Sequence, residues 1–304
     1  MEVTASKTFE EKDINLLATE SENKEEEYTP KLFSEGQDLQ SEETSTDSIE
    51  EDNKNSEQLF DQEIINEDED FEIPVPWFLI KHPQGDVIID GGMPIEAALD
   101  KHKHWGSVAD VYDPIMKVSE WCKDQVKTVN TNPEDVRNVI QTHLHLDHSG
   151  AIGHFPNATH ITQRVEYDYA FNPDWFSQPA YVREDFDKPN IRWKFLQGKK
   201  TDYFDLYGDG VIKIIFTPGH TPGHQSVLLN LPKTGHMLLT GDACYTGDHW
   251  CDRCLPGLVA SASDAADSVA KLRKIAKETN AKVVWGHDPV TWLDWKKAPM
   301  FYYD

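Results

Sequence analysis

The pattern of apolar and polar residues predicts a series of buried strands in the chain after residue 70. Short apolar runs bounded by turn residues are typical of such strands. The turn Pro83-Gln84-Gly85-Asp86 predicts a hairpin between the first two, and Pro74 and Pro76 favour an edge position for the start of the first. We expect strands at residues 73–80, 87–90, 136–142, 158–162, 211–216, 225–229, 237–240 and 282–285.

The clearest helix signal lies between the last two predicted strands. Its apolar residues recur at helical spacing, at Ala265, Val269, Leu272 and Ala276. Ser261 and Asp264 fit the start of a capped helix, and Asn280 fits its end. A weaker signal covers residues 163–171. Strands with interspersed helices predict an α/β protein with stacked sheets and a site along one rim.

Residues 1–70 differ from the rest of the chain in composition. They carry 24 acidic side chains against 5 lysines, so they hold −19 of the total net charge of −25, whereas all nine tryptophans lie in residues 71–304. Such a segment cannot bury enough apolar surface to offset the entropy lost on ordering. We therefore predict a disordered acidic tail over residues 1–70 and one domain over residues 71–304.

Composition also argues against several classes of protein. A net charge of −25 disfavours nucleic-acid binding, because an acidic surface repels phosphate groups. The sequence contains no run of 18 apolar residues, and its first 30 residues lack the pattern of a secretory leader. Four cysteines in 304 residues do not indicate a disulfide framework. These observations predict a cytoplasmic protein with neither a nucleic-acid nor a membrane partner.

A histidine-rich segment directly follows the strand predicted at residues 136–142. It reads His143-Leu144-His145-Leu146-Asp147-His148, so four ligand-type side chains fall within six positions. In an extended segment the first two histidines point the same way. A turn at Ser149-Gly150 can then bring Asp147 and His148 beside them. Imidazole and carboxylate ligands suit a divalent ion such as zinc.

Three further ligand-type residues stand in a matching setting, which argues against the alternative of a merely polar loop. His220, Asp242 and His287 each follow an apolar run and have a glycine as their preceding neighbour. Seven ligands are too many for one tetrahedral ion, but they suit two ions about 3.5–4 Å apart that share a carboxylate. We assign His143, His145 and His220 to one ion, Asp147, His148 and His287 to the other, and Asp242 as the bridge.

The motif H-x-H-x-D-H-x-G, followed by the spaced His, Asp and His, resembles the metallo-β-lactamase superfamily. This resemblance implies an αββα sandwich. Residues 217–226 (TPGHTPGHQS), 242–245 (DACY) and 286–289 (GHDP) further resemble the N-acyl homoserine lactone lactonases. That family implies an enzyme that opens the lactone ring of acyl homoserine lactones, which are quorum-sensing signals, with two divalent metal ions, most commonly Zn²⁺.

Six other segments are similar to the agrobacterial lactonase subgroup. They are residues 72–76 (EIPVP), 104–106 (HWG), 155–160 (FPNATH), 173–176 (PDWF), 185–189 (DFDKP) and 248–250 (DHW). The resemblance runs from about residue 71 to the C-terminus. The family has an additional apolar strand before the position of Glu72, where this chain has acidic sequence.

The resemblance also implies a mechanism. A hydroxide between the two ions would attack the lactone carbonyl, and Tyr245 would donate a hydrogen bond to the carbonyl oxygen as it gains charge. Asp147 would carry a proton to the leaving oxygen or act only as a ligand. The acyl chain needs an apolar wall, for which the candidates are Trp77, Phe171, Trp175 and Phe176.

Other functions fit parts of the same pattern. A thioesterase of the glyoxalase II type, or a lactonase for small lactones such as γ-butyrolactone, would use the same seven ligands, although Tyr245 favours the acyl homoserine lactonase. A class B β-lactamase lacks the bridging Asp, and a flavo-di-iron protein carries an acid where His145 stands. An interaction protein that uses its acidic tail is the non-enzymatic alternative.

Some reactive residues are not predicted to take part. Cys251 and Cys254 form a C-x-x-C without a second pair, which predicts neither redox chemistry nor a zinc site. Cys122 and Cys244 are expected to be buried. His224, four residues after His220, is expected to support the site rather than bind metal.

Overall fold

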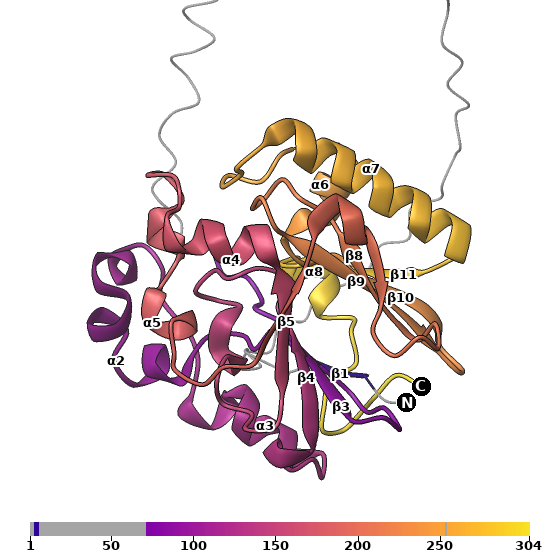
Figure 1. Ribbon diagram of the computed structural model, residues 1–304, viewed down its shortest axis with the longest axis horizontal. Coiled ribbons are helices and arrows are strands. Elements are labelled where there is room, and N and C mark those ends of the chain that lie inside the picture. Colours follow the sequence, from indigo (N-terminus) through magenta and orange to yellow (C-terminus); the bar gives the residue numbers. More distant parts are fainter. Residues whose placement is uncertain (1–2, 6–70, 253) are drawn as a thin grey trace, which may run out of the picture. The chain divides into compact units, whose positions relative to one another are not determined.

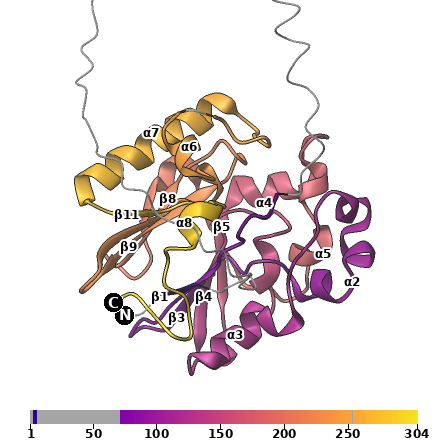
Figure 2. The same cartoon turned by 180° about the vertical axis from the view of Figure 1, so that it is seen from behind.

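The computed structural model describes residues 3–5, 71–252 and 254–304. Two β-sheets pack face to face, and helices cover their outer faces (Figure 1). The same arrangement seen from behind shows α7 (Ala262–Thr279) on one side and α3 (Cys122–Thr128) on the other (Figure 2). Apart from residues 3–5, the predicted disordered tail lies outside the described residues.

The first sheet has six strands in the order β1-β2-β3-β4-β5-β6. The pairs β1–β2 and β2–β3 are antiparallel, and the remaining pairs are parallel. The strands are β1 (Val3–Ala5), β2 (Phe78–Ile80), β3 (Asp86–Ile89), β4 (Val136–Ile140), β5 (Thr159–Gln163) and β6 (Trp193–Leu196).

The second sheet has five strands in the order β11-β10-β9-β8-β7. Its pairs are antiparallel except β10–β11, which is parallel. The strands are β7 (Tyr203–Asp205), β8 (Ile212–Phe216), β9 (Gln225–Leu231), β10 (Gly235–Leu239) and β11 (Lys282–Val284). The remaining α-helices are α2 (Ile95–Trp105), α4 (Arg164–Phe171), α5 (Arg183–Phe186), α6 (Gly247–Trp250) and α8 (Pro289–Trp292).

Successive side chains along each strand point to opposite faces of the sheet, so the apolar residues form three layers of core. Phe78 and Ile80 join residues of the second sheet in the central layer. Leu79, which lies between them, packs on the other face with Val126 of α3. On the far side, Leu238 of β10 packs with Leu272 of α7. This period of two confirms the predicted αββα sandwich, because both faces of each sheet are covered.

A seam of buried glutamines joins the two sheets near the ends of their strands. The side chain of Gln225 on β9 donates to the carbonyl oxygens of Gln141 (2.7 Å) and Ile161 (3.2 Å) in the first sheet. Its amide oxygen accepts from Gln163 (2.8 Å). The backbone N–H of Gln225 also donates to the carbonyl of Thr142 (2.9 Å). The polar seam therefore lies directly behind the histidine-rich segment.

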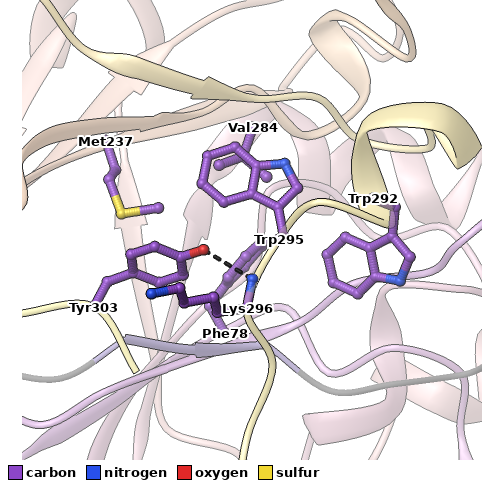
Figure 3. A pocket seen from close by; sticks show the side chains of 7 residues that line it. All are labelled: Phe78, Met237, Val284, Trp292, Trp295, Lys296 and Tyr303. Carbon is purple, nitrogen blue, oxygen red and sulfur yellow. Dashed lines mark hydrogen bonds between the residues drawn. The ribbon is translucent and has the colours of Figure 1, made fainter. Parts of the chain in front are cut away.

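Side chains from near the C-terminus cover one end of the central core (Figure 3). The backbone N–H of Lys296 donates to the Tyr303 hydroxyl at 2.8 Å. Phe78 of β2, Met237 of β10 and Val284 of β11 form a small pocket together with Trp292, Trp295, Lys296 and Tyr303. None of these seven lining residues is a predicted metal ligand, so the pocket belongs to the packing of the sandwich.

The N-terminal part of the first sheet differs from the prediction. Val3 pairs with Ile80 and Ala5 with Phe78, so β1 is the edge strand, and it belongs to the same compact unit as Ile73–Asp304. Residues 3–5 therefore supply a further strand of the first sheet, next to β2. The edge position predicted for the first apolar segment is wrong, because its prolines lie before β2 and outside the ladder.

Candidate metal centre

Four loops, each following a strand, carry the seven predicted ligands. The loop after β4 carries His143, His145, Asp147 and His148; His220 follows β8, Asp242 follows β10 and His287 follows β11. Strand β10 runs antiparallel to β9 and parallel to β11, and β8 is antiparallel to β9. Strands β8, β10 and β11 therefore end at the same rim, and all seven side chains meet there.

Gly219 explains how the His220 loop fits at this rim. Its φ is +140°, a conformation that other residues rarely adopt. A Cβ at this position would lie 2.3 Å from the backbone nitrogen of Ala265 in α7. The loop can therefore approach the start of α7 only with glycine before the ligand.

Three histidines form the first group of ring nitrogens. Nε2 of His220 lies 3.2 Å from Nε2 of His143 and 3.0 Å from Nδ1 of His145. Nitrogens bound to one tetrahedral zinc ion at about 2.0–2.1 Å lie about 3.3 Å apart. All three side chains are buried. The spacing is therefore close to that of three ligands of one ion.

Asp147, His148 and His287 form the second group. Oδ2 of Asp147 lies 3.6 Å from Nε2 of His148 and 3.7 Å from Nε2 of His287. Both histidines are buried, whereas the Asp147 side chain is 23% exposed. The partial exposure places this carboxylate where a substrate could approach it.

The carboxylate of Asp242 lies between the two groups. Its Oδ2 is 3.3 Å from His220 Nε2, and its Oδ1 is 3.2 Å from His148 Nε2. His287 Nε2 lies 3.1 Å from Oδ1. One oxygen thus faces each group, which is the geometry of a bridging carboxylate.

Hydrogen bonds on the outer side fix the ring orientations. Nδ1 of His148 bonds to Asp90 Oδ2 (2.9 Å), Nδ1 of His220 to the carbonyl of Leu258 (2.9 Å), and Nδ1 of His287 to the carbonyl of Pro74 (2.8 Å). A carbonyl can only accept, so Nδ1 of His220 and of His287 carries the proton. When these rings are neutral, their Nε2 atoms therefore turn a lone pair toward the centre, as in metal-binding histidines.

The centre holds buried atoms that need a cation. Nε2 of His148 and Oδ1 of Asp242 are buried, and within the described residues their nearest polar neighbours are other members of the centre, including each other at 3.2 Å. Polar atoms in such a position are costly unless something else satisfies them. Lone pairs of several imidazoles that converge on one point repel one another unless a positive charge lies between them. The donor set and its spacing therefore fit divalent metal ions.

The charges of the site shift its pKa values in opposite directions. Burial, together with His148 and His145, lowers the pKa of His143 well below its usual range, so this ring is neutral and able to bind metal. Burial opposes ionisation of Asp242, but His287, His148 and His143 outweigh it and hold the carboxyl pKa well below its usual range. Burial lowers and Asp242 raises the pKa of His287, to a net value of about 8.

Tyr245 lies at the edge of the three-histidine group. Its hydroxyl oxygen is 3.2 Å from Nδ1 of His220, which already donates to Leu258. Burial and then the nearby carboxylate of Asp242 raise the pKa of Tyr245. The phenol therefore stays protonated at neutral pH and can donate a hydrogen bond into the site.

Of two supporting residues, the sequence analysis predicted His224 and missed Asp90. His224 was expected to support the site, and its Nε2 accepts the backbone N–H of Asp242 at 3.0 Å. Asp90 was not singled out, although it too follows a strand and precedes a glycine. Its carboxylate binds His148 and also accepts from the backbone N–H and hydroxyl of Thr142. The pattern of strand, acid and glycine was the signal that could have identified it.

The four candidates for an apolar wall occupy different environments. Trp77 is buried in the layer between the first sheet and α3. Phe171 packs against the cluster that contains Leu144. The exposed rings are those of Trp175, at 85% exposure, and Phe176, at 38%.

The cysteines are arranged as expected. Cys122 and Cys244 are buried, Cys251 and Cys254 are exposed, and all four are free.

Within the described part of the chain, no helix is long and apolar enough to cross a membrane.

Comparison with protein families identifies the class of this fold and site. Residues 71–287 match the model of the metallo-beta-lactamase superfamily. The chain therefore belongs to that superfamily, as the H-x-H-x-D-H motif predicted.

Individual relatives identify a smaller group within this superfamily. The N-acyl homoserine lactonase AttM of Azorhizobium caulinodans is 58% identical over 233 residues, which span 77% of this chain and 89% of the relative. AttM of Agrobacterium fabrum is 57% identical over the same shares of each chain. A solved N-acyl homoserine lactone hydrolase, with N-hexanoyl-L-homoserine at its catalytic metal centre, matches with a TM-score of 0.69 and 26% identity, covering 79% of this chain and 91% of that one. These matches place the chain among the N-acyl homoserine lactonases.

Proposed function

We propose that this protein hydrolyses the lactone ring of N-acyl homoserine lactones at a centre of two divalent metal ions. The observation that carries the proposal is the division of seven ligand-type side chains into two groups that share Asp242. The AttM relatives, which are N-acyl homoserine lactonases, support this substrate class. The expected partner is therefore a small lactone.

The proposed ligands keep the assignment made from the sequence. One ion would be held by His143, His145 and His220 and the other by Asp147, His148 and His287. Asp242, whose two oxygens lie near His220 and His148, would bind both ions. Imidazole and carboxylate donors favour Zn²⁺ among the common divalent ions. When bound, two such ions supply a hydroxide at neutral pH and polarise the carbonyl of the substrate.

Residues of this chain would then direct the reaction. Tyr245 would donate a hydrogen bond from its hydroxyl to the carbonyl oxygen, which gains negative charge as the ring is attacked. Asp147, partly exposed at the mouth of the site, would carry a proton to the ring oxygen as it leaves. Trp175 and Phe176, with their exposed rings, are the proposed contacts of the acyl chain.

A proton-release assay tests this function. Ring opening forms a carboxylic acid, so the metal-loaded full chain should acidify a weakly buffered solution when an N-acyl homoserine lactone is added. Asp242→Asn should largely remove this activity, because it takes one bridging oxygen from the centre. A protein with two bound metals per chain and no acidification would contradict the proposed substrate. Thioesters and γ-butyrolactone, assayed in parallel, would then identify the alternative activity.

A further inference from the structure

Glu166 of α4 is a fully buried carboxylate that the proposed mechanism does not use. It is 0% exposed and accepts four hydrogen bonds. Oε1 accepts from the backbone N–H of Leu144 (3.0 Å) and the hydroxyl of Tyr181 (3.1 Å). Oε2 accepts from the hydroxyl of Thr221 (2.6 Å) and the backbone N–H of Gly223 (3.2 Å).

Three of these four partners, Leu144, Thr221 and Gly223, belong to the segments that carry the three-histidine group, and the fourth, Tyr181, packs against one of its histidines. Leu144 stands between His143 and His145, and Thr221 directly follows His220. The ring of Tyr181 packs edge-on against His145, with ring centroids 4.6 Å apart. One carboxylate therefore connects two loops that are far apart in sequence, at the point where they bring their histidines together.

The backbone of the second loop is shaped for this contact. A Cβ on Gly223 would lie 2.4 Å from the backbone nitrogen and the Cβ of Glu166. Only glycine therefore lets the loop after His220 approach α4 closely enough for its N–H to reach Oε2.

We propose that Glu166 is a positioning residue that sets the relative placement of His143, His145 and His220, and thereby the affinity of the metal position they form. The inference rests on the proposed two-metal site. The other position depends on different supports, since His148 is held by Asp90 and His287 by the carbonyl of Pro74. The effect of Glu166 is therefore selective for one of the two ions.

The chemistry of the four donors requires a carboxylate. Each oxygen of Glu166 receives one backbone N–H, from Leu144 or Gly223, and a backbone N–H cannot reverse its role. In Glu166→Gln, the amide group would direct its own hydrogens at one of these N–H groups in either orientation. The substitution keeps the size of the side chain but separates the two loops.

Metal titration of the full chain tests the inference. The apo-protein is titrated with Co²⁺ in the presence of a competing chelator, and the visible spectrum of each bound ion is recorded. We expect the parent to bind two ions per chain. Glu166→Gln should lower the affinity for one of the two ions by roughly 10- to 100-fold, which is typical when a hydrogen-bond partner of a metal ligand is lost. It should also change the visible spectrum of that ion. The affinity of the other ion should change much less.

Asp185→Asn is the matched control. Asp185 is also a buried carboxylate, on α5, but it binds His104 (2.8 Å) and Ser149 (3.0 Å). Ser149 directly follows His148, a proposed ligand of the other ion, and Asp185 bonds to neither Leu144 nor the loop after His220. This variant should leave the affinity of the ion affected by Glu166→Gln unchanged. Thr221→Val removes only one of the four hydrogen-bond donors, so it should lower the affinity for the same ion by a smaller factor. This variant replaces Glu166→Gln in the experiment if Glu166→Gln does not fold.

The outcomes separate this inference from the proposed function. A parent that binds no metal would overturn the two-metal site and the inference with it. If the parent binds two ions and opens the lactone, but both affinities fall equally in Glu166→Gln or neither changes, the proposed function stands and the positioning role of Glu166 is rejected.

Discussion

Each histidine of the metal centre has two ring nitrogens, and the structure directs one of them outward in most cases. His143, His148, His220 and His287 turn Nδ1 to an oxygen on the outside and Nε2 to the centre. His145 instead faces His220 with Nδ1. The choice of nitrogen follows from which oxygens surround each ring.

Tyr245→Phe tests the proposed role of the phenol. The variant keeps the ring beside His287 but loses the hydroxyl that would stabilise the charged carbonyl oxygen. We expect kcat to fall roughly 10²-fold or more, with little change in metal content, measured by proton release and metal analysis. Tyr203→Phe, at a tyrosine that is 55% exposed, is the control and should keep full activity. Equal kcat values for the parent and Tyr245→Phe would exclude this role.

His160 of β5 gives a prediction about acid stability. Its Nε2 accepts the backbone N–H of Gly153 at 3.1 Å, and burial lowers its pKa to about 4. The unfolded chain, with a pKa near 6.5, takes up this proton first as the pH falls. The stability that neutral His160 contributes is therefore present above pH 6.5 and lost as the pH falls toward 4, by about 3 kcal/mol in total.

Unfolding of the metal-loaded protein between pH 7 and pH 4 measures this effect. His160→Gln keeps an acceptor for Gly153 but cannot take up the proton, so its free energy of unfolding should depend less on pH than that of the parent. Loss of metal in acid affects both proteins and cancels in the difference. Parallel curves for the two proteins would argue against the assignment to His160.

The sequence predicts which residues gather at the site much better than it predicts their supports. Ligands are recognisable because His and Asp recur after apolar runs, and all seven meet in the structure. Glu166 lies inside a weak helix signal, and its four partners come from three other segments. Such a contact depends on the packing of distant loops, which no local pattern reveals.

At the scale of secondary structure, α7 shows how an element holds a ligand. The backbone N–H groups of Ala260 and Ser261 donate to the carbonyl of Gly219, and the Ser268 hydroxyl donates to that of Pro218 (2.6 Å). The start of the helix therefore fixes the loop that ends in His220. The predicted caps are confirmed: Ser261 accepts from the backbone N–H of Asp264, and Asn280 adopts the left-handed conformation.

Ser261→Ala should lower the free energy of unfolding by about 1 kcal/mol, because the N–H of Asp264 loses its acceptor. Denaturant unfolding of the metal-loaded protein measures this change. Ser263→Ala, at an exposed position within the same helix, is the matched control and should be neutral or slightly stabilising. Equal losses in both variants would mean that the cap contributes nothing.

Elements with weak local signals were missed. The sequence analysis did not predict β6, β7, α2 or α3. Strands β6 and β7 are four and three residues long and lie at the edges of their sheets, where few of their residues are buried. Helix α2 is interrupted by non-helical dihedral angles at Asp100 and is polar along much of its length. Packing against the rest of the domain, rather than local preference, determines these elements.

At the scale of the whole molecule, the metal centre joins the two sheets. His143 and His148 follow β4 of the first sheet, whereas His220, Asp242 and His287 follow strands of the second. Ions bound between them would act as a cross-link at the rim of the sandwich.

Removal of metal should therefore destabilise the entire domain. Ligands that bind only the folded state raise its stability in proportion to RT ln(1 + [L]/Kd), about 4 kcal/mol at 1,000-fold saturation. We expect chelation to lower the melting temperature and re-addition of Zn²⁺ to restore it, as measured by calorimetry. Asp242→Asn, which weakens both positions, should show a smaller response to the chelator. An unchanged melting temperature would show that the centre does not support the fold.

The glutamine seam behind the histidine-rich segment has a further consequence. Hydrogen bonds are directional, unlike contacts between apolar side chains. Gln225 donates to Gln141 and Ile161 and accepts from Gln163, and these bonds are lost if either sheet shifts by one residue. The seam therefore fixes the position of one sheet relative to the other. The spacing between ligands of different sheets is set before any ion arrives, so the apo-protein presents a preorganised site rather than one that the metal must assemble.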